Sequence, residues 1–347
     1  MELYASGFNA WNQLHFDHHS NTASPPPEKT EPDDIHAFTC VLRDEVIDHV
    51  RPFLSYTLVN SRPMGLRSAG MIPKGREEAA LRIRTAGDDE IPTNFVEASN
   101  GIVVAYDNAT NSITQHPSIH DPISNTDNKT SFSLPQGQAI TQLVSYSTGF
   151  AALSTSGQVY TWGAADERYA ACLGREVDPQ NPATVPSHVP DLADLPTGPT
   201  RKLSAGGYTL AALTAGNDLY IWGQPSPASA SKSSPTILAD YLTDRPTPVD
   251  INNKDIADIA IGDDHLLALT TDNELYVVGD NSSGQLGFPP DTKSFIGEWT
   301  LVHIPGVEQG GKSIAAVVAG PRNSFVIVRS NDTYRFGRKE KVNKSLN

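Results

Sequence analysis

Four residues near the start of the chain have side chains of the kind that bind metals. The cluster consists of His15, Asp17, His18 and His19. Imidazole nitrogens and carboxylate oxygens are ligands for zinc and other transition metals. Most of these residues fall in a polar, Pro-rich segment without sustained periodicity, so we interpret the cluster as an accidental gathering of histidines in a loop. We expect no metal site there and no cofactor in the protein.

A second chemically equipped group is formed by Asp263, Asp264 and His265. Two neighbouring carboxylates can divide the acid and base roles of a mechanism, and histidine is the most frequent general base. The sequence supplies no third group that would complete a mechanism. We therefore interpret the two aspartates as solvated loop residues and His265 as a structural residue that bonds a neighbouring part of the fold.

Motifs for the common enzyme chemistries are missing from the sequence. There is no phosphate-binding Gly-x-x-x-x-Gly-Lys-Ser/Thr loop, no Gly-x-Gly-x-x-Gly and no Gly-x-Ser-x-Gly. The two cysteines, Cys40 and Cys172, have no Cys-x-x-Cys partner, which argues against a structural zinc site. So few cysteines also exclude a secreted disulfide scaffold and fit a reducing compartment. We expect a protein without catalytic residues.

Length and charge narrow the remaining functions. The chain has 347 residues and a formal net charge of −14. Nucleic acids and anionic membranes both require a basic face, so neither is expected as a direct partner. The N-terminus lacks the pattern of a secretory signal, and no apolar run approaches the roughly 20 residues of a membrane span. We expect an intracellular protein, cytoplasmic, nuclear or both.

The elements that would position any site are revealed by internal repeats. Three segments of 18 residues align without gaps, at 146–163, 206–223 and 262–279. Each contains a small or apolar strand, a polar turn rich in Gly, Asn or Asp, and an alternating second strand such as LYIWG. Weaker copies occur at 51–70, 98–116 and 320–337. A period of about 50 residues with short strands is typical of a β-propeller.

The repeats therefore predict an all-β fold, with one propeller domain over 1–337 and six countable hairpins. A polar, Pro-rich loop is expected at 17–37, and a basic tail at 338–347. The stray strand LYASG (3–7) competes with DTYRFG (332–337) for one place in the last blade. We favour 3–7, because an N-terminal strand added to the last blade closes the ring and removes an exposed sheet edge.

The segment GDDHLLALTTDNELYVVGDNSSGQLGF (262–288) resembles the repeat of the regulator of chromosome condensation family. The short chain is most similar to the small single-domain members of that family. The resemblance implies a propeller, which has seven blades in the family prototype. Two features depart from the prototype: the repeat histidine survives only at His265, and the acidic residues of 15–34 replace its basic N-terminal tail.

The tryptophans divide into two groups. Trp162 and Trp222 occupy the same position in two strong copies, so they are predicted to pack in the core or between blades. Trp11 and Trp299 lie in connecting segments. Each is either an exposed anchor for a partner or a lid over a blade edge, and the sequence leaves both open.

A candidate binding face follows from the positions of the loops. Equivalent loops of successive blades must lie on one face around the axis, and their residues are free to specify a partner because the strands make the core. The residues that we assign to partner binding are Phe53, Asn100, Thr148, Tyr208, Asp263, Asp264 and Arg322. Phe, Tyr and Arg often anchor interfaces. The alternative is that these side chains only fill the funnel of the propeller.

We therefore predict a non-catalytic scaffold or adaptor that acts as a monomeric propeller. It would present a rigid, acidic face to a partner protein with a basic patch, for instance within a chromatin- or tRNA-modification complex. The resemblance implies one alternative, a guanine-nucleotide exchange factor for a small Ran-like GTPase. An enzyme or ligand-binding propeller with a site in the central channel is a further alternative.

Overall fold

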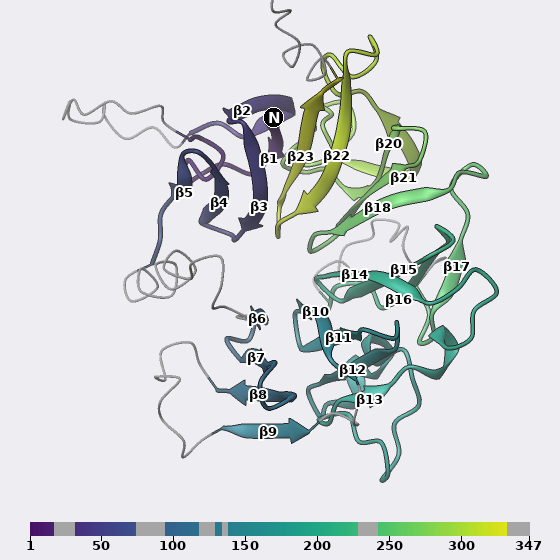
Figure 1. The fold of residues 1–347 in the computed structure, drawn as a ribbon. Coiled ribbons are helices and arrows are strands. Elements are labelled where there is room, and N and C mark those ends of the chain that lie inside the picture. Colours follow the sequence, from purple (N-terminus) through teal and green to yellow (C-terminus); the bar gives the residue numbers. More distant parts are fainter. Residues whose placement is uncertain (17–31, 74–93, 118–128, 134–137, 228–241, 332–347) are drawn as a thin grey trace, which may run out of the picture.

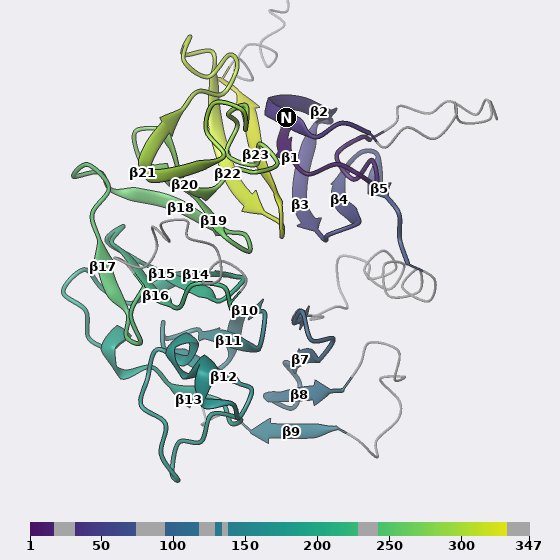
Figure 2. The ribbon, with the colours of Figure 1, turned by 180° about the vertical axis from the view of Figure 1, so that it is seen from behind.

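The computed structural model describes residues 1–16, 32–73, 94–117, 129–133, 138–227 and 242–331. Within these ranges the strands form six antiparallel sheets, five with four strands and one with three. The sheets follow one another around a common axis as the blades of a propeller (Figures 1 and 2). The expected all-β propeller with six units is confirmed, and no seventh sheet occurs in the described residues.

Each blade begins with a strand near the axis and continues outward. The innermost strands are β3 (Val46–Pro52), β6 (Asn94–Glu97), β10 (Ile140–Tyr146), β14 (Thr200–Gly206), β18 (Ile256–Ile261) and β22 (Lys312–Ala319). The second strands are β4 (Tyr56–Arg62), β7 (Val103–Asp107), β11 (Gly149–Ser154), β15 (Thr209–Thr214), β19 (His265–Thr270) and β23 (Asn323–Ser330). Hairpins of this kind arise because the strand sequences alternate and the turns carry Gly, Asn or Asp.

The outer strands complete the blades. The third strands are β5 (Gly65–Gly70), β8 (Ser112–His116), β12 (Val159–Gly163), β16 (Leu219–Gly223), β20 (Leu275–Asp280) and β1 (Glu2–Gly7). The fourth strands are β9 (Thr130–Ser133), β13 (Ser187–His188), β17 (Thr247–Val249), β21 (Phe295–Val302) and β2 (Ile35–Arg43). Two short 3-10 helices, η2 (Glu167–Leu173) and η3 (Pro190–Leu192), lie in the connection between β12 and β14.

The core lies between the blades. Every residue of β11, β15 and β19 is buried, because both faces of a blade pack against a neighbour. Trp162 and Trp222 are fully buried, as predicted for that repeat position. The Trp222 indole N–H donates to the Cys172 carbonyl oxygen at 3.0 Å, which satisfies its polar group inside the core.

Polar side chains join neighbouring inner strands. Gln142 on β10 donates to the Leu203 carbonyl and accepts from the Leu203 amide on β14, both at 2.8 Å. On β18, the Asp258 carboxylate pairs with Lys202 of the preceding blade and accepts at 3.1 Å from the Val317 amide of the following one. These bonds fix the rotation of each blade against the next.

The ring is closed by the N-terminal strand, as predicted. β1 pairs antiparallel with β23, with Leu3 opposite Ile327 and Gly7 opposite Asn323. Residues 332–337, the competing segment, lie outside the described residues. β2 then covers the edge of β1. It begins at Ile35, within the segment where the sequence indicated a loop.

Candidate protein-interaction face

The six loops between the innermost and second strands form one ring, which we call the loop ring. It consists of residues 53–55, 98–102, 147–148, 207–208, 262–264 and 320–322. Backbone hydrogen bonds tie successive loops together: the Ser147 amide donates to the Gly207 carbonyl at 2.7 Å, and the Asp263 amide donates to the Pro321 carbonyl at 3.2 Å. Four of the six loops are therefore tied in pairs at one end of the axis.

Glycine is required where the loops approach each other most closely. Gly207 has φ +52°, and a Cβ there would lie 2.0 Å from the Asp263 carbonyl oxygen. Gly262 faces the His265 imidazole so closely that a Cβ would overlap it. The small residues that open the repeat in the sequence are thus explained by loop-to-loop contact rather than by a ligand.

His265 is a structural residue, as interpreted from the sequence. Its ring is fully buried, and Nε2 lies 3.0 Å from the Ser324 hydroxyl on β23 of the next blade. Burial lowers the pKa of His265 to about 4, so the imidazole is neutral near pH 7. Its position inside the fold, away from solvent, does not suit a general base for an external substrate.

The acidic residues give the loop ring its charge. Asp263 is exposed, but the neighbouring loops crowd its carboxyl group. This burial and the charge of Asp264 raise the pKa of Asp263 to about 6, although Arg322 and the Gly207 backbone act in the opposite direction. Two carboxylates and one guanidinium are the charged side chains of the loop ring near pH 7.

The aromatic and basic candidates are held by defined contacts. Phe53 stacks on Tyr56 with ring centroids 4.3 Å apart. Tyr208 stacks on Tyr169 of η2 at 5.5 Å. Both rings remain half-buried, with part of their surface open to a partner.

Arg322 is exposed but anchored. Its guanidinium donates to the Ser283 hydroxyl at 2.8 Å and lies 4.6 Å from the centroid of the Phe8 ring. Asn100 is exposed in its turn and accepts from the Ile102 amide at 3.1 Å, whereas Thr148 is half-buried. The structure thus gathers all seven candidates on the loop ring, although only some of them present a large contact area.

The repeat register in the first two blades differs from the alignment made on the sequence. That alignment placed Leu54 and Gly101 at the position of His265. The strands instead put Tyr56 there, opposite the closing Gly70, and Val103, opposite His116. The loop of the first blade has three residues, as the loop at 262–264 has, so Leu54 occupies the place that Asp263 has in its blade; the loop of the second blade has five residues. Pairing the second strand with the third strand from the closing Gly70 would have identified Tyr56 as the residue at the position of His265.

The remaining candidates from the sequence have no common site. His15 Nδ1 lies 3.1 Å from the Asn9 amide nitrogen, and Asp17, His18 and His19 lie outside the described residues. Among the residues that the structure describes, no group of three or more His, Cys, Asp or Glu could hold a metal ion. No helix in the described ranges is long and apolar enough to cross a membrane.

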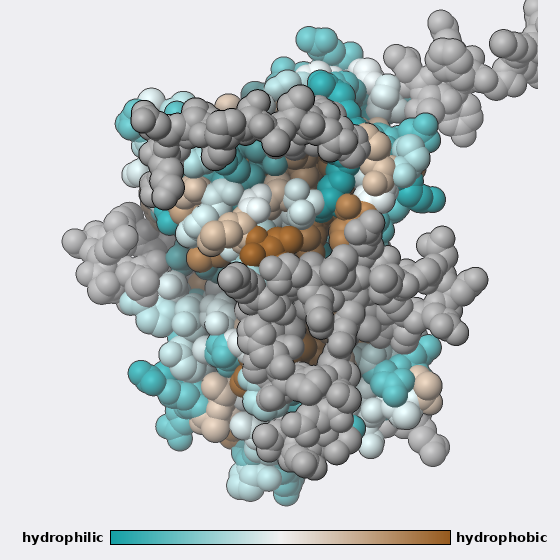
Figure 3. All heavy atoms as spheres, turned by 90° about the vertical axis from the view of Figure 1, so that its left-hand side faces the viewer, coloured by the Kyte–Doolittle hydropathy of each residue, from teal (hydrophilic) through white to brown (hydrophobic). Residues whose placement is uncertain are grey.

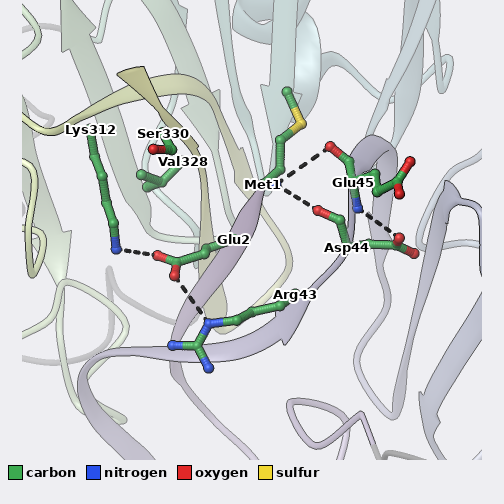
Figure 4. Close-up of a pocket in the computed structure, with 8 residues that line it drawn as sticks. All are labelled: Met1, Glu2, Arg43, Asp44, Glu45, Lys312, Val328 and Ser330. Carbon is green, nitrogen blue, oxygen red and sulfur yellow. Dashed lines mark hydrogen bonds and ion pairs between the residues drawn. The ribbon is translucent and has the colours of Figure 1, made fainter. Parts of the chain in front are cut away.

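A cavity of about 470 Å³ lies beside the ring closure, and its charges are used internally (Figure 4). Glu2 pairs with Lys312 at 2.5 Å and with Arg43 at 3.0 Å. Although burial raises its pKa, hydrogen bonds from Lys312, Arg43 and Tyr4 lower the pKa of Glu2 to about 2. These ion pairs therefore support the closure of β1 onto its blade.

A second cavity, of about 490 Å³, lies at the end of the propeller opposite the loop ring. Its lining includes Arg201, Lys202 and Asp258. The Arg201 guanidinium donates to the carbonyl oxygens of Thr214 and Ala257, at 3.0 and 2.8 Å, and Lys202 pairs with Asp258. These groups join blades, so neither cavity offers the free nucleophile or acid–base pair of an active site.

Comparison with known proteins agrees with this architecture. Residues 256–285 match the family model for the regulator of chromosome condensation (RCC1) repeat. The regulator of chromosome condensation of Mus musculus is 32% identical over 140 residues, which cover 40% of this chain and 30% of the relative. The chain thus matches less than a third of the length of that relative.

Solved structures extend the likeness to the whole propeller. Human WBSCR16 has a TM-score of 0.61 at 14% identity, covering 95% of this chain and 100% of that one. Prp20p from Saccharomyces cerevisiae has a TM-score of 0.52 at 13% identity, covering 94% and 90%. At these identities the likeness shows the fold. The molecule has the fold of an RCC1-type β-propeller, and its repeat at 256–285 is similar to the regulator of chromosome condensation repeat.

Proposed function

We propose that the protein is a non-catalytic scaffold or adaptor that binds a partner protein through the loop ring. The observation that carries this proposal is the composition and fixation of the ring: Phe53 and Tyr208 are held by stacking on Tyr56 and Tyr169, and Arg322 lies over the Phe8 ring. A surface that is ordered before binding loses little conformational entropy when the partner arrives. Aromatic and arginine side chains are the usual sources of binding energy.

The charge of the ring favours a basic partner. Asp263 and Asp264 lie on one loop, and the single cation, Arg322, is already engaged by Ser283 and the Phe8 ring. The whole chain carries −14, so a basic patch would be attracted over a distance of about one Debye length. We infer that the adaptor acts as a single propeller in the cytoplasm, the nucleus or both, for instance in a chromatin- or tRNA-modification complex.

The proposal is tested by truncating Phe53, Tyr208 and Arg322 together to alanine. Partners recovered with the wild-type chain in an affinity pull-down should be lost, while the melting temperature stays close to that of the wild type. A matched triple variant at exposed apolar positions outside the ring, Met64, Val177 and Val185, should keep the partners. Recovery of every partner by the first variant would show that the loop ring is not the interface.

A second candidate function is nucleotide exchange on a small GTPase. It is favoured by the likeness to Prp20p, whose structure is described together with its binding to Gsp1p and histones. Our proposal expects no acceleration when the protein is added to a Ran-type GTPase loaded with a fluorescent guanine nucleotide. Stimulated release of that nucleotide, lost in the triple variant, would replace the adaptor function by exchange activity.

A further inference from the structure

Three exposed apolar side chains gather at the edge of the loop ring, to which Leu54 belongs, and we call them the apolar patch: Trp11, Leu54 and Met71. Their exposed fractions are 36%, 47% and 54%. The structure describes only four other large apolar side chains with comparable exposure, namely Met64, Val177, Val185 and Leu301. Figure 3 looks at the left-hand side of the view in Figure 1, and hydrophobic residues are visible near the middle of that face. Clustered apolar exposure of this kind marks interaction surfaces more often than single exposed residues do.

The patch is assembled from three chain segments by two buried or half-buried polar residues. The buried Gln13 side chain donates to the Leu54 carbonyl at 3.1 Å and accepts from the Trp11 amide at 2.9 Å. The Ser55 hydroxyl donates to the Met71 carbonyl at 2.9 Å, and the Met71 amide donates back to the Ser55 carbonyl at 2.8 Å. Trp11, Leu54 and Met71 are therefore fixed relative to one another.

The aromatic rings of Phe8, Phe53 and Tyr56 pack next to the patch and connect it to the rest of the loop ring. Phe53 and Ile72 pack against the buried Tyr56. On the other side, Trp11 meets Phe8 edge to face, with ring centroids 5.4 Å apart, and Arg322 lies over that same Phe8 ring. The patch and the loop ring thus form one surface through Phe8 and Phe53.

The border of the patch is acidic. Asn9, next to Phe8, donates its backbone amide to the Asp34 carboxylate at 2.8 Å and its side-chain amide to the carbonyl of the exposed Asp33 at 3.1 Å. An occupant that is apolar at its centre and basic at its edge would complement both features.

We propose that the apolar patch docks a segment of the partner protein that carries apolar side chains flanked by lysine or arginine. This inference rests on the proposed adaptor function and names the chemistry of the partner. A second copy of the chain is a poorer occupant, because a two-fold interface centred on the patch would bring the acidic side chains of both copies into one interface. An anionic membrane would be repelled by the same carboxylates.

The test selects short random peptides from a displayed library on the wild-type protein. Selected sequences should combine apolar and basic residues. Leu54→Asp should weaken a selected synthetic peptide about tenfold or more, because it places a charge in the apolar contact. Met64→Asp, at the other end of β4, is the matched control and should bind as the wild type does. Both residues are exposed, so both variants should keep the wild-type melting temperature.

Trp11 supplies a second readout. It is the most exposed tryptophan described, since Trp162 and Trp222 are fully buried and Trp299 is half-buried. Acrylamide should quench Trp11 in the free protein, and a bound peptide should protect it; Trp11→Phe should remove the quenchable signal. A Trp11 that acrylamide cannot reach would mean that the chain itself covers the patch, which would overturn the inference.

The remaining outcomes separate the two proposals. Enrichment of acidic peptides, no enrichment over empty support, or equal binding by Leu54→Asp would overturn the apolar patch as a docking site. If peptide binding instead fails in Tyr208→Ala and survives in Leu54→Asp, the loop ring binds partners through its other loops and the patch does not, so the adaptor function stands alone. A concentration-dependent dimer that Leu54→Asp dissolves would make a second copy the occupant and overturn the proposed partner chemistry.

Discussion

The blades from β10 to β21 differ from the first two blades of the ring in their loops and in the contacts between neighbouring blades. In the former, two- or three-residue loops, buried second strands and polar links such as Gln142 to Leu203 repeat from blade to blade. In the latter, the loop of the second blade lengthens to five residues, and Arg51 of the first blade lies 5.5 Å from the Phe95 ring centroid of the second. The regular blades make the core, and the irregular ones carry the exposed Leu54. Departure from the repeat thus coincides with surface available for binding.

The largest difference in stability between the two regions is expected when a core tryptophan is removed from a regular blade. Trp222→Ala deletes a fully buried ring that also hydrogen-bonds Cys172. We expect the free energy of unfolding to fall by about 4 kcal/mol, measured by urea denaturation. The same measurement on Leu54→Ala in the irregular region should change it by less than about 0.5 kcal/mol. Equal losses for the two variants would contradict the division between core and binding surface.

The pH dependence of the free energy of unfolding tests the roles of His265 and Asp263 in one of the regular blades. His265 has a folded-state pKa of about 4, below the ordinary 6.5 of the unfolded chain. Its contribution is therefore complete above pH 6.5 and is lost as the pH falls toward 4, by at most about 3 kcal/mol. Asp263 acts oppositely: its pKa is raised to about 6, so its carboxylate costs stability at neutral pH, and the cost disappears as the pH falls from 6 toward 4.

The two groups can be separated in an Asp263→Asn background. There, the free energy of unfolding should fall between pH 6.5 and 4, and His265→Gln should flatten that fall. Urea denaturation at a series of pH values supplies the measurement. A His265→Gln variant with the same pH slope would show that another group is responsible.

Alanine substitutions at two glycines compare how tightly the loops of the two regions are constrained. Gly207→Ala in a regular loop adds strain at φ +52° and a clash with the Asp263 carbonyl oxygen. Gly101→Ala in the second blade has a similar φ of +84° but no atom within 4 Å of the added methyl group. We expect losses of more than about 2 kcal/mol for Gly207→Ala and about 1 kcal/mol for Gly101→Ala in thermal or urea unfolding. A larger loss at Gly101 would mean that the second-blade loop is the more constrained.

The strong repeats allowed much of this fold to be predicted. A strand with alternating residues that ends in Gly, as in LYIWG, can be recognised from a few neighbouring residues. The hairpins and the closing strand at 3–7 could therefore be predicted from the sequence. The register of the first two blades did not, because loops of different length satisfy the same strands. Tyr208 stacking on Tyr169 and Arg322 lying on Phe8 also join segments that are far apart in the chain. No local pattern records such contacts.

The apolar patch also could not be predicted from the sequence. Trp11 could be read either as an exposed anchor or as a lid, and only the fold places it 36% exposed beside Leu54 and Met71. The link between them is Gln13, a polar residue that is buried because its amide bonds two backbones. Sequence patterns of apolar residues carry no information about such a bridge.

Hydrogen–deuterium exchange of the protein, free and bound to the partner recovered in the pull-down, tests the central claim most directly. Binding should slow amide exchange in the loop ring, above all at 53–55, 207–208 and 320–322. Exchange should stay unchanged in the turns at the opposite end of the blades, 155–157, 215–218 and 271–273. Protection confined to those opposite turns would contradict the assignment of the loop ring as the partner-binding face.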